Sequence, residues 1–551
     1  MLPSAAMHRL LCAFLIVLPL VVLTVPVPAR AGSSEIGPGR EPPPSLPGDT
    51  ILVPQDASTI QEAVDRAEPG GLVLISPGVY EEAVVVTTPF VTIRGTDRNR
   101  VVLDGGFALD NAIAVIEADG VAVENLTVRN YLVNGLFWST VFGYRASYVT
   151  AYNDGHHGLS ADDSRYGQFD HDYASGHPDS GFSISGCFPC DAVITDVLAE
   201  GNALGFSGTN AGGNLLVVNS EWRDNRAGVV PNTLDSEVEP PQQGVVIAGN
   251  WVHDNNAADA PATELRYPAL GIGILVEGGR DDTITHNLVE GHETFGIAIL
   301  PSHDERLWLT QNNEVHDNVV RASGDADLAL GFPAAGGDCF SSNDFGSSLP
   351  AAIEWRNGCG SWLRDAAGGS LGADIGPLVR VLQTRAGDVE VGDWRSQPPP
   401  PEQPSMPNAS TAPPLPALAG ESVPERIHIR DTRTLDVHVS SDFSREVTVL
   451  GTPLATTWWG VLLGLYAYAL PLILYSAWIS IALWDLVRQD AVPNRVRLGW
   501  MVAVIAVPVL GPVAYYAFGR SPIQGSLRLM LVAGGMAIYL VLATLGVLLG
   551  A

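Results

Sequence analysis

The feature that most constrains the fold is a glycine, next to apolar residues, that recurs at nearly constant spacing. It occurs at five successive places, Gly135, Gly158, Gly181, Gly205 and Gly228, which lie 23, 23, 24 and 23 residues apart. After an insertion, Gly273 and Gly296 repeat the spacing of 23. One such unit is too short to bury its own apolar side chains, so successive units must stack along an axis. The period therefore predicts a solenoid of coils of about 23 residues.

The residues between these glycines are typical of short strands. Residues 123–128 and 245–252 alternate apolar and polar side chains, as strands with one face inward do. Asn130 and Asn153 share one position of the repeat, and Asn202 and Asn225 share a neighbouring one. We expect such asparagines to stack as a hydrogen-bonded ladder inside a turn. The repeat fades after about Leu330.

The first ordered segment adds a resemblance to a known family. Residues 51–67 predict a short helix capped by Ser58 or Thr59, and short β runs follow it together with the turn Pro77-Gly78-Val79-Tyr80-Glu81-Glu82. This order resembles the opening of right-handed parallel β-helix proteins of the pectin-lyase-like superfamily. The predicted fold class is therefore an all-β, right-handed parallel β-helix over residues 51–395, followed by a C-terminal α-helical transmembrane region.

The N-terminal residues predict export. His8 and Arg9 precede an apolar run, Leu10–Val25, and Ala29-Arg30-Ala31 forms a small-x-small cleavage site. Residues 1–31 are predicted to be a signal peptide, with an uncleaved anchor as the alternative, and residues 32–50 a flexible segment.

Cleavage would remove Cys12 and leave four cysteines in an oxidising compartment. The predicted disulfides are Cys187–Cys190 and Cys339–Cys359. The Cys-x-x-Cys pair leaves metal binding or thiol exchange open as alternatives.

Beyond the β-helix the composition changes twice. Residues 396–424 are rich in proline, including Pro398–Pro401, and predict an extended, semi-rigid stalk. Residues 425–453 predict a short β segment. Residues 454–551 predict a membrane domain of three transmembrane helices, at 458–483, 498–518 and 529–549.

The membrane region resembles the N-terminal membrane domain of cardiolipin synthases of the phospholipase D superfamily. The matching residues are Trp484-Asp485-Leu486-Val487-Arg488, Trp500, Pro508-Val509-Leu510-Gly511-Pro512 and Tyr516-Ala517-Phe518-Gly519-Arg520. Phospholipase D chemistry needs a His-x-Lys-x-x-x-x-Asp motif, and the sequence contains no lysine. The resemblance therefore implies residence in the membrane without lipid catalysis. We predict a cell-membrane protein whose β-helix is extracytoplasmic.

The formal net charge of −30 excludes nucleic acid as a partner, because a phosphate backbone requires a basic surface. The predicted partners are the membrane, through the C-terminal helices, and a polysaccharide.

Candidate chemistry is concentrated between residues 153 and 179. Aligning coils on the glycine places Asp154 over His177, His156 over Asp179 and His157 over Ser180. Stacked coils are about 4.8 Å apart, so imidazoles and carboxylates meet and general acid–base catalysis becomes feasible. The candidate catalytic residues are Asp154, His156, His157, Asp162, Asp163, Arg165, His177 and Asp179. The same set could bind a divalent cation such as calcium, or could form only a solvated turn.

Two short motifs extend the family resemblance. Asp162-Asp163 with Arg165 is similar to a fragment of pectate-lyase-like or polygalacturonase-like sites, although Gly-His-Gly and Arg-Ile-Lys are absent. Tyr166-Gly167 with Asp170-His171 resembles a mannuronan-epimerase-like motif without its proline. The resemblance implies a polysaccharide lyase, an epimerase or a glycoside hydrolase.

Three hypotheses of function follow. The first is a membrane-anchored protein that binds or modifies a cell-envelope or extracellular polysaccharide. The second is a non-catalytic adhesion scaffold on a stalk, and the third a periplasmic metal-handling protein of the copper-maturation β-helix type. Outward-facing aromatic rings would favour the first hypothesis, because sugars stack on them. The candidate rings are Trp138, Tyr148, Tyr166 and Tyr173.

Overall fold

The computed structural model describes residues 48–262, 270–361, 369, 372–386 and 391–414. It also describes short stretches at 429–430, 432, 448–449, 452–453, 482–483, 485–486, 493–506, 510–518 and 532–533. The predicted signal peptide and most of the predicted flexible segment, 32–50, lie outside these residues.

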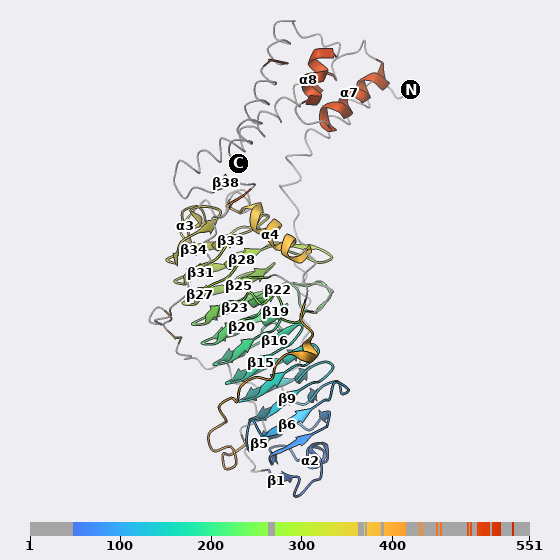
Figure 1. Cartoon of the computed structure of the whole chain (residues 1–551), viewed down its shortest axis with the longest axis vertical. Coiled ribbons are helices and arrows are strands. Elements are labelled where there is room, and N and C mark those ends of the chain that lie inside the picture. The colour runs from blue at the N-terminus through green and yellow to red at the C-terminus, as the bar shows by residue number, and fades with distance from the viewer. Residues whose placement is uncertain are drawn as a thin grey trace. The chain divides into compact units, whose positions relative to one another are not determined.

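Three parallel sheets form the body of residues 48–349, and their strands are stacked coil upon coil (Figure 1). Sheet A contains β1 (Thr50–Val53), β2 (Leu72–Ile75), β5 (Thr92–Gly95), β8 (Val121–Glu124), β11 (Phe142–Ser147), β14 (Arg165–Asp170), β17 (Ala192–Thr195), β20 (Gly212–Val218), β23 (Gln243–Ala248), β26 (Thr283–Thr285), β31 (Glu314–His316) and β34 (Cys339–Ser341). Sheet B contains β3 (Gly78–Tyr80), β6 (Val101–Asp104), β9 (Thr127–Arg129), β12 (Thr150–Tyr152), β15 (Tyr173–Ser175), β18 (Leu198–Glu200), β21 (Glu221–Arg223), β24 (Trp251–His253), β27 (Leu288–Glu290), β32 (Val319–Arg321) and β35 (Asp344–Phe345). Sheet C contains β4 (Val84–Val86), β7 (Ile113–Ile116), β10 (Leu136–Ser139), β13 (His157–Asp162), β16 (Ser180–Ser185), β19 (Leu204–Thr209), β22 (Ala227–Asn232), β25 (Ile272–Glu277), β28 (Phe295–Leu300), β33 (Ala326–Leu330) and β36 (Ser348–Leu349).

The recurrent glycines are stacked directly above one another, at the start of the sheet C strands. A Cβ atom on Gly135 would lie 2.6 Å from the carbonyl oxygen of Gly158, and one on Gly158 would lie 2.6 Å from that of Gly181. Leu159, next to Gly158, pairs with Leu136 below and Phe182 above. The close approach of adjacent coils leaves no room for a side chain, which explains the period. The predicted solenoid is confirmed.

Both ends of the solenoid carry helices. Helix α2 (Ile60–Arg66) begins at Thr59, whose hydroxyl accepts a hydrogen bond from the backbone N–H of Glu62 at 3.1 Å, and it buries Ile60 and Val64 at the first coils. At the other end α3 (Ile353–Arg356) follows β36, and α4 (Ile375–Ala386) packs Val381 against the outer face of sheet C. Helices α2 and α3 cover apolar surface that further coils would otherwise bury, whereas α4 covers apolar side chains on the outer face of sheet C.

Inward side chains form one continuous apolar core. Its aromatic members include Trp138, which is fully buried against Tyr144 and Phe169. Trp138 is therefore not a sugar-stacking residue, and Tyr173 is 2% exposed.

The asparagine ladder is present at two turns. Asn202 accepts a hydrogen bond from the backbone N–H of His177, and Asn225 accepts one from the backbone N–H of Asn202, both at 3.0 Å. A second ladder, between sheets A and B, contains Asn250, Asn287, Asn318 and Asn343. Asn130 and Asn153 have a different role, because both adopt positive φ at the preceding turn position.

Cys187 is bonded to Cys190, and Cys339 to Cys359. The second bond joins β34 to the segment after α3.

The proline-rich segment departs from the sequence expectation. Residues 397–406 contain no helix, strand or turn, and residues 407–412 form turns. The whole segment 397–413 lies against the β-helix instead of forming a free stalk. Arg98 donates to the carbonyl oxygen of Pro404 at 3.0 Å, and Asn99 exchanges two hydrogen bonds of 2.9 Å with Gln403. Arg94, fully buried, donates to the carbonyl oxygens of residues 409, 412 and 413. We call residues 397–413 the strap.

Further elements are short. They are β29 (Ser302–His303), β30 (Leu307–Trp308), η2 (Trp394–Ser396), β37 (Thr448–Val449), β38 (Thr452–Pro453), α7 (Asn494–Ala506) and α8 (Leu510–Phe518). Of the predicted β segment 425–453, the part that the structure describes includes the antiparallel pair β37–β38. No helix among the described residues is both long and apolar enough to cross a bilayer. The predicted spans 458–483 and 529–549 lie almost wholly outside those residues.

Candidate functional site

The eight candidate residues do not converge on one site. Strand β13 begins at His157 and ends at Asp162, and its rise of about 3.3 Å per residue separates the two by roughly 16 Å. Asp162, whose carboxylate accepts a hydrogen bond from the Ser185 hydroxyl at 2.8 Å, lies with Asp163 and Arg165 between sheets C and A. The other five residues lie between sheets B and C.

Asp154 and His177 lie in adjacent coils next to each other, as the alignment on the recurrent glycines predicted, but both side chains are completely buried. The Asp154 carboxylate accepts a hydrogen bond from the backbone N–H of Tyr131 at 2.9 Å, and its Oδ2 lies 3.9 Å from His177 Nδ1. Burial raises the pKa of Asp154 well above its usual range and lowers the pKa of His177 to about 4. Burial therefore favours the neutral form of both groups, and both are closed to solvent.

The position of His177 explains its burial. It stands in the ladder that continues through Asn202, Asn225 and Asn255, and Asn255 in turn contacts His292 Nε2 at 3.2 Å. The side chains at this position point into the coil and bond to backbone groups, and His177 does so through the carbonyl oxygen of Ala151 at 3.3 Å. This arrangement supports a structural role for the pair.

The remaining three residues, His156, His157 and Asp179, form what we call the histidine cluster. His156 Nε2 lies 3.4 Å from Asp179 Oδ2, and His157 Nδ1 lies 3.6 Å from Asp179 Oδ1. The two rings are 3.9 Å apart, and the His156 side chain is 46% exposed. The cluster therefore opens to solvent on one side.

The electrostatics of the cluster distinguish its two imidazoles. Burial lowers the pKa of His157 to about 3, with a further contribution from His156. Burial alone would also lower the pKa of His156, but the carboxylate of Asp179, assisted by Glu237, raises it above the ordinary value. Burial would raise the pKa of Asp179, and the two histidines instead hold it below its usual range.

A second polar feature, missed from the sequence, follows the outer face of sheet B. We call it the sheet B stripe, and it consists of Tyr173, Glu200, Glu221, Arg223, Trp251, His253, Glu290 and Arg321. Tyr173, His253 and Glu290 are buried within the stripe, and the other members are at least partly exposed. Arg223 links Glu200 and Glu221 at 2.8 and 2.9 Å. His253 Nε2 lies 3.2 Å from the carboxylate of Glu221.

The stripe continues through an aromatic residue. Trp251 stacks on His253 with ring centroids 3.9 Å apart, and its Nε1 donates to Glu290 at 3.0 Å. Arg321 donates to the other Glu290 oxygen at 2.8 Å. Side chains of six consecutive sheet B strands, β15 to β32, are thereby joined through hydrogen bonds and ring contacts.

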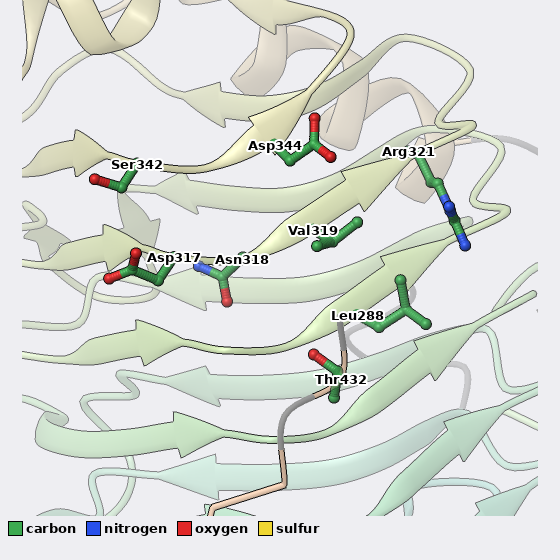
Figure 2. Close-up of a pocket in the computed structure, with 8 residues that line it drawn as sticks. All are labelled: Leu288, Asp317, Asn318, Val319, Arg321, Ser342, Asp344 and Thr432. Atoms are coloured by element: carbon green, nitrogen blue, oxygen red, sulfur yellow. The ribbon is translucent and has the colours of Figure 1, made fainter. Parts of the chain in front are cut away.

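A cavity of about 270 Å³ lies at the C-terminal end of the stripe (Figure 2). Figure 2 shows Arg321, Val319 and Leu288 along sheet B, with Thr432 of the C-terminal segment nearby. Its lining residues are Leu288, Asp317, Asn318, Val319, Arg321, Ser342, Asp344 and Thr432. The mixed lining offers apolar contact together with hydrogen-bonding groups.

The sheet B stripe cannot be found from a constant spacing in the sequence, because its coils differ in length. Arg223, His253, Glu290 and Arg321 occupy the same position in successive coils. They are 30, 37 and 31 residues apart because loops of different length interrupt the coils. A usable signal precedes each strand, since ladder residues Asn250, Asn287 and Asn318 stand directly before β24, β27 and β32.

Comparison with known proteins agrees with this architecture. Residues 134–320 match the family model described as right handed beta helix region. The solenoid is a right-handed β-helix. Residues 477–520 match the Phospholipase_D-nuclease N-terminal model, in line with the predicted resemblance. No curated protein matches the chain.

Several solved structures are similar at low identity. The mannuronan C-5 epimerase A-module of Azotobacter vinelandii is 15% identical, with 50% of this chain and 86% of that chain covered and a TM-score of 0.34. An alginate lyase from a Paenibacillus species is 13% identical, with coverage of 54% and 99% and a TM-score of 0.34. The catalytic domain of a GH87 alpha-1,3-glucanase is 16% identical, with coverage of 57% and 67% and a TM-score of 0.37. These similarities concern the fold alone.

Proposed function

We propose that this protein binds a polysaccharide along the outer face of sheet B, on the extracytoplasmic side of the cell membrane. The observation that carries the proposal is the sheet B stripe, a continuous row of polar and aromatic side chains that ends at a cavity. Binding is the part of the hypothesis that the stripe supports, since the eight residues considered for catalysis are dispersed.

The stripe suits a chain-like ligand in length and direction. Adjacent coils are about 4.8 Å apart, so the five steps from β15 to β32 span roughly 24 Å. A linear polysaccharide lying along the solenoid axis would pass over the same strand positions at every coil, although the side chains at those positions differ. The three-residue strands of sheet B project their first and third side chains away from the core, and those of β18 and β21 are partly exposed whereas those of β15 and β27 are buried.

The chemistry of the stripe suits hydroxyl groups. Carboxylate and guanidinium groups offer fixed pairs of acceptors and donors, and the Trp251 ring offers an apolar face for a sugar ring. The charges are nearly balanced, because Glu200, Glu221 and Glu290 face two arginines and a histidine. With a net charge of −30 over the whole chain, a neutral polysaccharide is favoured over a polyanionic one.

Two observations support the proposed location. The disulfides Cys187–Cys190 and Cys339–Cys359 are typical of an oxidising compartment. The match of residues 477–520 supports a membrane tether at the C-terminal end. A free-standing adhesion stalk is less well supported, because the strap is bound to the β-helix.

Affinity electrophoresis of the full-length protein, in gels containing neutral or acidic polysaccharides, tests the proposal. We predict that a neutral polysaccharide retards the protein and that Trp251→Ala weakens binding by about tenfold, the effect of about 1.4 kcal/mol of lost stacking. Trp355→Ala is the matched control, since Trp355 is 72% exposed on α3. Equal retardation of the Trp251→Ala and unmutated proteins, or no retardation by any polysaccharide, would refute the proposal.

A further inference from the structure

We propose that His156, His157 and Asp179 form a binding site for a divalent first-row transition metal ion, with zinc as the reference ion. Among the described residues, these three are the ones whose potential ligand atoms all lie within 4.8 Å of one another. The site lies between sheets B and C and does not depend on the proposed polysaccharide face.

The distances fit a shared ion better than they fit direct ion pairs. Zinc ligands about 2.1 Å from the metal in a tetrahedral arrangement are about 3.4 Å from each other. The imidazole–carboxylate separations in the cluster are 3.4 and 3.6 Å. Charge-assisted hydrogen bonds are shorter, about 2.7–2.9 Å. Each imidazole therefore faces a different oxygen of the same carboxylate at the spacing of metal ligands.

Other histidine–aspartate contacts of this protein provide the contrast. His253 lies 2.8 Å from Asp254, His316 lies 2.9 Å from Asp317, and each aspartate follows its histidine directly in the sequence. Those pairs are ordinary hydrogen bonds. In the histidine cluster the carboxylate comes from the next coil, 22 residues after His157, and it stands between two rings.

The backbone holds the three residues in place before any ion binds. The N–H of His156 donates to the carbonyl oxygen of Val133 at 2.7 Å, and the N–H of Asp179 donates to the carbonyl oxygen of His156 at 3.2 Å. His157 pairs with Ser180 in the β13–β16 ladder. His157 Nδ1 also lies 2.8 Å from the Ser180 hydroxyl, and an ion bound at Nδ1 would replace that contact. Such preorganisation lowers the entropic cost of metal binding.

The donor set determines the class of ion. Calcium and magnesium prefer oxygen ligands, whereas two imidazole nitrogens with one carboxylate suit zinc and its neighbours. Three protein ligands leave one tetrahedral position for solvent, and the half-exposed His156 lies on the open side. The Glu237 carboxylate, which acts electrostatically on His156, adds negative potential that favours a cation.

Zinc titration by isothermal calorimetry, with full-length protein freed of metal by a chelator, tests the site. We expect one zinc ion per chain to bind with 1:1 stoichiometry and calcium not to compete. Asp179→Asn and His156→Asn should each weaken zinc binding by at least about tenfold, since a lost ligand costs no less than a lost outer partner. Cobalt should give the visible absorption of a four-coordinate ion in the unmutated protein and lose it in both variants.

His316→Asn is the matched control, because among the described residues His316 is paired with a single aspartate, its neighbour Asp317. Zinc affinity that is the same in Asp179→Asn, His316→Asn and unmutated proteins would overturn the proposal and assign any bound zinc to adventitious surface histidines. Absence of stoichiometric binding would overturn it as well. His156→Asn, at a half-exposed position, provides the test if Asp179→Asn does not fold. Neither failure bears on polysaccharide binding.

Discussion

At the scale of single residues, position in the coil determines what a polar side chain does. His156 and His177 lie 21 residues apart in sequence and in adjacent coils, yet one faces solvent and the other is fully buried. The ladder position of His177 is occupied by asparagine in the next coils, at Asn202 and Asn225. This relation leads to a prediction about acid stability.

We predict that His177→Asn makes the protein less sensitive to acid. Because the pKa of His177 is lowered to about 4, below the unfolded value near 6.5, the unfolded chain binds a proton that the folded chain does not. Stability at this residue is thus present above pH 6.5 and is lost as the pH falls towards 4, by about 3 kcal/mol. Burial of Asp154 acts in the opposite sense, and the substitution leaves that carboxyl in place.

Chemical denaturation at pH 7 and pH 4 measures the effect. The loss of unfolding free energy between the two values should be smaller in His177→Asn than in the unmutated protein and in the His316→Asn control. Identical acid sensitivity in all three proteins would show that His177 does not titrate in this way.

The alignment on glycines predicted which residues meet, but it did not predict which are buried. It placed Asp154 beside His177 and His156 beside Asp179, and both contacts are present. Whether a side chain at the bend points inward depends on the local backbone, for which the period carries no information. Only the structure could therefore show that Asp154 and His177 are buried while the histidine cluster is open to solvent.

At the scale of elements, the strap shows the limit of composition. Proline-rich sequence favours an extended local conformation, but residues 407–412 of the strap form turns. Which surface the segment contacts depends on groups about 300 residues away, such as Arg98 and Asn99, whose bonds to residues 403–405 have no sequence signature. The sheet B stripe was missed for a similar reason, since unequal loops hide its register.

We predict that Asn99→Ala releases the strap while the β-helix stays folded. The substitution removes two hydrogen bonds to Gln403, a loss of about 1–2 kcal/mol, and should raise the rate of cleavage within residues 397–413 about tenfold. Limited digestion with a broad-specificity protease, followed by mass spectrometry, measures the rate. Arg100→Ala is the control, because Arg100 is exposed one residue away. Equal cleavage rates in Asn99→Ala and Arg100→Ala proteins would contradict a bound strap.

At the scale of the whole molecule, the fold distributes polar chemistry over separate faces of one solenoid. Because the coils repeat, residues at equivalent positions of each turn and each face form a continuous row along the axis. An arrangement found in one coil therefore recurs in its neighbours. The same repetition made the fold predictable from a single sequence, because the glycine period reports a contact between coils. The sheet B stripe, on which the proposed function depends, was less predictable because loops of unequal length interrupt its coils.

The most direct test of the proposed binding is hydroxyl-radical footprinting of the full-length protein with and without the neutral polysaccharide that retards it most in affinity electrophoresis. We predict that the ligand protects Trp251 from oxidation, because the ring lies in the middle of the sheet B stripe. Trp355, exposed on α3, should react equally in both samples. Unchanged oxidation of Trp251 together with protection of His156 and His157 would place the ligand at the histidine cluster and contradict the account.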